Sequence, residues 1–164
     1  MFRNVTLRLG LALIVLAVAA YPVMAAKSTF VATMNGGNEI PARDTSAAGF
    51  ARFVLSADGT EIAYKLIVAN IVDVTQAHIH CGPPDLNGPV VAFLYGFGPT
   101  VSPDGILAQG TITAANVVAV GDSPACPGGV ATLADLVAKI QNGGAYANVH
   151  TVALPGGEVR GQIR

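Results

Sequence analysis

The sequence predicts an all-β fold: a Greek-key-like antiparallel β-sandwich or barrel with one short helix near the C-terminal third. Two observations support this expectation. Short runs rich in Val, Ile, Thr, Phe and Tyr alternate with turn-forming clusters, and the 164 residues include 19 Gly and 10 Pro. Apolar residues with the spacing of a helix occur in one segment. We therefore expect residues 26–164 to form one domain built mainly of strands.

The expected strands follow the apolar runs along the chain. The runs at residues 50–55 and 62–69 flank a turn that contains Asp58-Gly59, and this pair accepts the positive φ of a tight hairpin. The other runs are separated by Gly, Pro and Asn in the same way. They predict strands at residues 28–34, 74–80, 90–95, 106–113, 145–151 and 158–163.

The one expected helix precedes the last two strands. Four apolar residues lie at the i, i+3, i+4 and i+7 positions of one helical face: Leu133, Leu136, Val137 and Ile140. Thr132 and Asp135 have the spacing of a capping box, with Asp in the place of the usual Glu. Asn142-Gly143 supplies a C-terminal stop. We expect this helix to lie across one end of the sheets.

The N-terminus has the pattern of a secretory signal peptide. Arg3 and Arg8 precede an apolar run at residues 11–20, and small residues lead to a cleavage site at Ala25. The run is shorter than the roughly 20 residues that span a bilayer. We therefore expect residues 1–25 to be removed and the domain to be secreted or periplasmic. An uncleaved membrane anchor is the alternative.

Charge and cysteine content limit the partners of the expected domain. Cleavage removes two of the nine basic residues and none of the ten acidic ones, so seven remain against ten, a formal charge near −3. Without a basic patch, nucleic acid and anionic membranes are poor partners, and no later apolar stretch is long enough to span a membrane. In an exported protein, the two cysteines, Cys81 and Cys126, are expected to form a disulfide.

The three histidines of the chain are candidate metal ligands. His78 and His80 are two residues apart on one strand, so their side chains share a face about 6.7 Å apart along the chain. Ile79 and Val149 are expected to face the core, which turns His78, His80 and His150 outward toward solvent. If the two strands are neighbours, the three imidazoles converge. Three neutral imidazoles with an open position suit copper or zinc.

Three further polar residues are candidates to orient these ligands. Tyr146 and Asn148 share the face of His150, and Glu158 belongs to the following strand. Glu158 also has two other interpretations: a surface pair with Arg160, or an acid–base pair with Glu39. A blue-copper site is disfavoured because Cys81 faces away from His80. The sequence lacks the G-x-S-x-G elbow that would indicate a serine hydrolase.

Several separated motifs resemble the CHRD domain, the family named after chordin. They are Phe30–Met34, Gly37–Pro41, Gly49–Ala51, Ala77–Gly82, Asn87–Val91, Tyr146–Thr151 and Pro155–Ile163. The resemblance covers roughly residues 28–164 and implies a secreted β-sandwich or barrel. It implies no single biochemical activity. The His-x-His strand is also similar to the copper strand of Cu/Zn superoxide dismutases, whose site uses more histidines than this chain contains.

Three functional hypotheses follow. The first is a non-enzymatic, exported binding module that holds one copper or zinc ion through the three histidines. The second is a metal-free structural or adhesive protein of the cell envelope. The third is a metal-dependent redox enzyme that uses the open coordination position.

Overall fold

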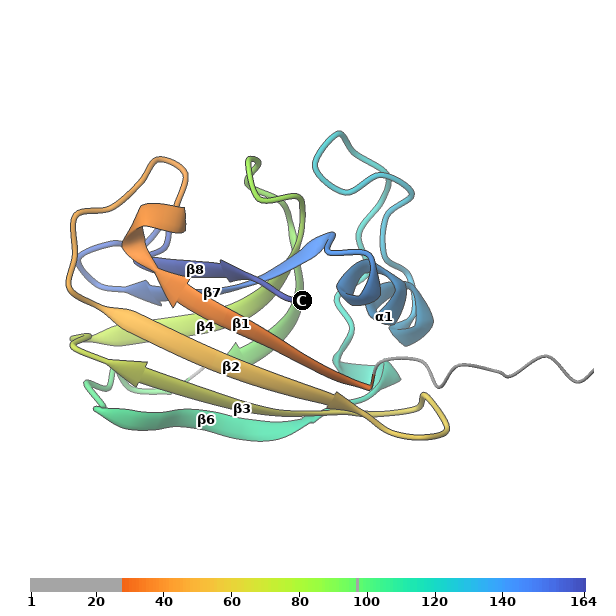
Figure 1. Ribbon diagram of the computed structural model, residues 1–164, viewed down its shortest axis with the longest axis horizontal. Helices are drawn as coiled ribbons and strands as arrows, with labels where there is room; N and C mark the ends of the chain where they lie inside the picture. The colour runs from red at the N-terminus through yellow and green to blue at the C-terminus, as the bar shows by residue number, and fades with distance from the viewer. Residues whose placement is uncertain (1–27, 97) are drawn as a thin grey trace, which may run out of the picture.

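The computed structural model describes residues 28–96 and 98–164. The expected signal peptide, residues 1–25, lies outside the described residues. The described strands form one eight-stranded antiparallel sheet that curls into a nearly closed barrel (Figure 1). The expected all-β fold with one short helix is therefore confirmed.

The elements agree closely with the expected runs. Each expected strand is present, with ends that differ by no more than two residues, because the apolar runs stop where Gly, Pro and Asn begin. The strands are β1 (Thr29–Asn35), β2 (Ala48–Leu55), β3 (Ile62–Ala69), β4 (Val74–Cys81), β5 (Val90–Tyr95), β6 (Gly105–Ile112), β7 (Ala145–Thr151) and β8 (Val159–Gln162). Helix α1 covers Leu133–Gln141, and short 3₁₀ turns cover Gly36–Asn38 and Ala114–Asn116.

The strand order around the barrel is β5-β4-β7-β8-β1-β2-β3-β6. Strands β1, β2 and β3 are neighbours in chain order, and the last strand, β8, returns to lie beside β1. The edge strands β5 and β6 approach each other, and the Tyr64 hydroxyl of β3 donates to the Leu94 carbonyl of β5 at 2.8 Å. The barrel therefore nearly closes through side chains rather than through a ninth strand.

The interior of the barrel is apolar. Phe53, Leu66 and Ile79 are fully buried in it. Helix α1 lies at one end of the barrel (Figure 1) and inserts buried side chains that include Leu136 and Ile140. Its N-terminus is held by the expected capping box between Thr132 and Asp135. In the described part of the chain, no helix has the length and apolar character needed to cross a membrane.

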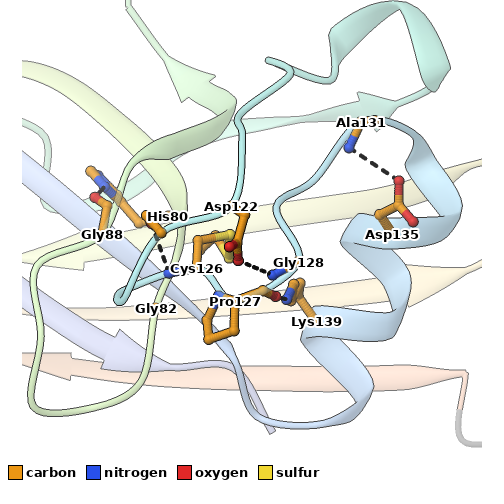
Figure 2. The surroundings of a disulfide bond; sticks show 12 residues. His80, Gly82, Gly88, Asp122, Cys126, Pro127, Gly128, Ala131, Asp135 and Lys139 are labelled. Atoms are coloured by element: carbon orange, nitrogen blue, oxygen red, sulfur yellow. Dashed lines mark hydrogen bonds between the residues drawn. A yellow bond between two sulfur atoms is a disulfide. The ribbon is translucent and has the colours of Figure 1, made fainter.

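A disulfide joins Cys81, at the end of β4, to Cys126 in the segment before α1, with 5.4 Å between the Cα atoms. Both cysteines are buried. Figure 2 shows that segment beside α1, where Lys139 donates to the Pro127 carbonyl and the Asp122 carboxylate accepts from the Gly128 amide. The expected pairing is confirmed, and it fixes the long 113–132 connection against the strand that carries His78 and His80.

Candidate metal centre

The alternation of β4 places two of the histidines on the side of the sheet opposite the core. Ala77, Ile79 and Cys81 belong to the buried apolar core. His78 and His80 therefore lie on the other face. In the sheet, β4 pairs with β7 so that His78 is opposite Asn148, His80 is opposite Tyr146 and Gln76 is opposite His150. The two strands that carry the histidines are thus neighbours, as expected, and all three imidazoles share one face.

The three imidazoles form a compact cluster. One nitrogen from each ring lies within 4.8 Å of the others. Nδ1 of His78 is 3.1 Å from Nε2 of His150. The ring centroid of His80 lies 5.5 Å from that of His78 and 5.9 Å from that of His150. Such spacing is compatible with a single ion that draws all three nitrogens toward it.

The expectation that the imidazoles are exposed to solvent is wrong for two of them. His78 and His80 are only 4% and 8% exposed, and His150 is partly buried. Although their face lies outside the barrel, it is covered. The Phe93 ring packs edge-on against His78 at 4.6 Å, and the Tyr146 ring stacks on His80 at 4.8 Å. Alternation predicts the side of a sheet but not what lies over it.

Backbone carbonyls orient two of the rings. His80 Nδ1 lies 2.9 Å from the Gly88 carbonyl, and His150 Nδ1 lies 3.0 Å from the Pro155 carbonyl. A carbonyl only accepts, so each Nδ1 carries the proton and donates. A neutral imidazole has one N–H, so Nε2 of each ring keeps its lone pair. Histidines that bind metals are commonly fixed by such outward N–H bonds. Figure 2 shows the His80 ring beside Gly88.

The position of the proton on the third ring, His78, follows from the tautomer of His150. Because His150 Nε2 keeps its lone pair, the neighbouring His78 Nδ1 carries a proton and donates to it. His78 Nε2 is then a lone-pair nitrogen as well. Both His78 Nε2 and His80 Nε2 are buried without a hydrogen-bond partner. A buried polar atom without a partner destabilises a fold by roughly 1–3 kcal/mol, so these two lone pairs are positions where a ligand could bind.

The surroundings keep the rings neutral. Burial lowers the pKa of His78 to about 3, and nearby His150 and His80 lower it further. Burial is also the main cause that lowers the pKa of His80 to about 4, against the opposing effect of the Gly88 carbonyl. Burial lowers the pKa of His150 too. Neutral imidazole is the form that coordinates metals, so the cluster is in its binding form at neutral pH.

The residues expected to orient the ligands fall into two groups. Tyr146 contacts the cluster directly: its ring is parallel to His80 within 7°, and its hydroxyl accepts from the Gly88 amide at 3.0 Å. Asn148 lies opposite His78 but donates to the Val159 carbonyl and to Glu39.

Glu158 makes its hydrogen bonds with residues other than the three histidines. It accepts from the Thr45 and Thr151 hydroxyls at 2.7 Å each. Its expected pairing with Arg160 is wrong, because the guanidinium donates to other groups. Nor do Glu39 and Glu158 form an acid–base pair, since each carboxylate is bound to different side chains.

Glu39 is a residue whose surroundings the sequence did not predict. Its position in a turn suggests exposure, but the side chain is 6% exposed and accepts from the Asn148 amide at 2.5 Å. Burial raises its pKa to about 7, although Asn148, Arg160 and Arg43 act in the opposite direction. The sequence places Glu39 between two turn-forming stretches, and this position does not predict which face of the sheet its side chain covers.

An open cavity of about 720 Å³ lies over β1 and β8. Its lining includes Glu39, Arg160 and Gln162 but none of the three histidines. A molecule held in this cavity would therefore lie beside Glu39 and Arg160 rather than beside the imidazoles. The cavity and the histidine cluster are separate features of the same sheet face.

Fold and site together define a small antiparallel β-barrel domain with a covered cluster of three histidines on its outer face. The chain belongs to the CHRD family, since the model of the CHRD domain matches residues 30–163. No curated protein and no solved structure matches the chain significantly.

Proposed function

We propose that this chain is an exported binding module that holds one copper or zinc ion through His78, His80 and His150. The observation that carries the proposal is the pair of buried Nε2 atoms, on His78 and His80, that have no hydrogen-bond partner within a cluster 4.8 Å across. An ion bound by these two lone pairs would satisfy both atoms at once, and His150 Nε2 would become the third ligand by exchanging its hydrogen bond from His78 Nδ1 for the ion.

The ligand set favours copper or zinc over other ions. Neutral imidazoles suit both metals, whereas calcium and magnesium prefer oxygen ligands. The disulfide between Cys81 and Cys126 consumes both thiols of the chain, so a blue-copper site with a thiolate ligand is not supported.

Metal content is the direct test. Protein purified from its native compartment and dialysed should contain about one copper or zinc per chain by elemental analysis. His78→Ala should lose that metal. Gln76→Ala is the matched control, because Gln76 lies opposite His150 on the same strand as His78, and it should retain the metal. A dialysed wild type without metal, which also fails to bind added copper or zinc, would favour the structural or adhesive alternative.

Export needs its own measurement. Cleavage after Ala25 would give a secreted or periplasmic chain that begins at Ala26. The mass of the protein recovered from outside the cytoplasm tests this. A recovered chain that retains residues 1–25 would support the uncleaved anchor instead.

A metal-dependent redox enzyme is the second candidate. Three protein ligands leave one position of a tetrahedral ion for a water or a substrate, as in catalytic zinc sites. Turnover that depends on added metal and disappears in His80→Ala would favour this function over simple binding.

A further inference from the structure

Arg160 is a buried cation beside the histidine cluster. It is 1% exposed on β8, and its guanidinium carbon lies 3.4 Å from the centre of the Tyr146 ring. Burial lowers its pKa from the usual value. A buried charge is costly unless it is fully hydrogen-bonded, so the partners of this guanidinium indicate what it holds in place.

The guanidinium is bound to the loop between β4 and β5. It donates to the Pro83 carbonyl at 2.8 Å, to the Leu86 carbonyl at 2.7 Å and to the Asn87 side-chain oxygen at 3.0 Å. The planar fork of Arg can serve three acceptors on one loop, whereas the single ammonium of Lys cannot reproduce that arrangement. The loop from Pro83 to Asn87 is thus tied to β8.

The same loop continues into the group that orients His80. Gly88 follows Asn87, and its carbonyl accepts from His80 Nδ1 while its amide donates to the Tyr146 hydroxyl. Tyr146 in turn stacks on His80. Arg160 therefore contacts both structures that fix this imidazole: the loop that carries the acceptor carbonyl and the ring that covers its face.

We propose that Arg160 is a positioning residue for the metal site, holding the Pro83–Gly88 loop and the Tyr146 ring so that His80 keeps its Nδ1 proton and presents Nε2 to the ion. This inference rests on the proposed metal binding. Its mechanism, however, concerns the tautomer and orientation of His80, which exist before any ion is bound.

The first arm of the test uses the metal-free protein. In the wild type, ¹⁵N spectra of the imidazoles should show His80 protonated at Nδ1. Arg160→Lys keeps the charge but loses the fork, and it should give a mixture of His80 tautomers. Arg164→Lys is the matched control, because Arg164 is exposed and lines the neighbouring cavity, and it should leave the tautomer unchanged.

The second arm measures metal binding. Arg160→Lys should weaken the binding of copper(II), measured by competition with a chelator, by about 10- to 100-fold, the range for losing a group that orients a ligand. Its copper(II) EPR spectrum should also change. Arg164→Lys should stay within about twofold of the wild type with the same spectrum. A merely structural Arg would alter thermal stability but neither the tautomer nor the spectrum.

Each result has a defined meaning. A folded Arg160→Lys variant with the wild-type tautomer and affinity overturns the proposal. A wild type that binds no metal overturns the proposed function, whereas the tautomer arm still reports on the positioning role of Arg160. If Arg160→Lys fails to fold, Asn87→Ala removes one of the three guanidinium acceptors and should shift both readouts in the same direction.

Discussion

The two faces of β4 differ in what they require of their surroundings. Ala77, Ile79 and Cys81 lie in an apolar core, where close packing alone is sufficient. His78 and His80, on the opposite face, are as well covered but carry polar atoms that need partners. The core face is complete, whereas the histidine face retains two nitrogens without partners. The face that packing does not complete is therefore where a ligand is expected.

The largest expected effect concerns the core face. Replacing both Cys81 and Cys126 by Ala removes a cross-link between residues 45 apart, and it should lower the free energy of unfolding by roughly 4 kcal/mol. Chemical denaturation of the metal-free variant measures the loss. If the double variant matched the stability of the wild type, the core face would not depend on its cross-link.

Truncation of Ile79, the core side chain between the two histidines, should have the next largest effect on the free energy of unfolding. Ile79→Ala removes a fully buried side chain and should lower the free energy of unfolding by about 3 kcal/mol. Because Ile79 points away from the imidazoles, the folded variant should still bind one metal ion. Loss of metal binding in a folded Ile79→Ala protein would show that the two faces are not independent.

Metal should stabilise only chains with a complete histidine face. At a free metal concentration 100 times the Kd, the free energy of unfolding of the wild type should rise by about 2.7 kcal/mol. Thermal unfolding with and without copper or zinc measures this shift. His150→Ala should show little shift, whereas a similar shift in that variant would place the ion elsewhere.

Ionisation of Glu39 should lower the stability of the fold between mildly acidic and neutral pH. Its pKa of about 7 in the folded protein exceeds the usual 4.5, so the folded state holds the proton more tightly and loses stability as the pH rises from about 4.5 to 7. Glu39→Gln cannot ionise and still offers an oxygen to Asn148. From pH 5 to pH 8 it should gain about 1 kcal/mol relative to the wild type, a value reduced for solvent screening.

The smallest expected effect is the pH dependence of metal binding. Protons compete for His78 and His80 only as the pH approaches their pKa values of about 3 and 4. The Kd for copper(II) or zinc, after correction for metal hydrolysis, should therefore change little between pH 7.5 and pH 6. A tenfold weakening over this range would mean that the imidazoles titrate near 6.5, as exposed histidines do.

The sequence predicted the strands and the face of the histidines because both depend on local alternation. The Ile79 position alone sets the direction of His78 and His80. The burial of His78 and His80 could not be predicted in this way, because the groups that cover them, such as Phe93 and the Gly88 carbonyl, come from other parts of the chain. The alternation of β8 could have placed Arg160 on the histidine face, but not its contacts with a loop more than 70 residues away.

The pairing of β8 with β1 joins the two ends of the domain, as Asn35 lies opposite Arg160. A chain in which β8 has not yet formed cannot close its barrel, because β8 joins β7 to β1. Arg160 lies on β8, and the proposed ligands His80 and His150 are 70 positions apart in the sequence. The proposed metal site is therefore completed only once β8 has paired, and the ions present where folding finishes would be the first that it encounters.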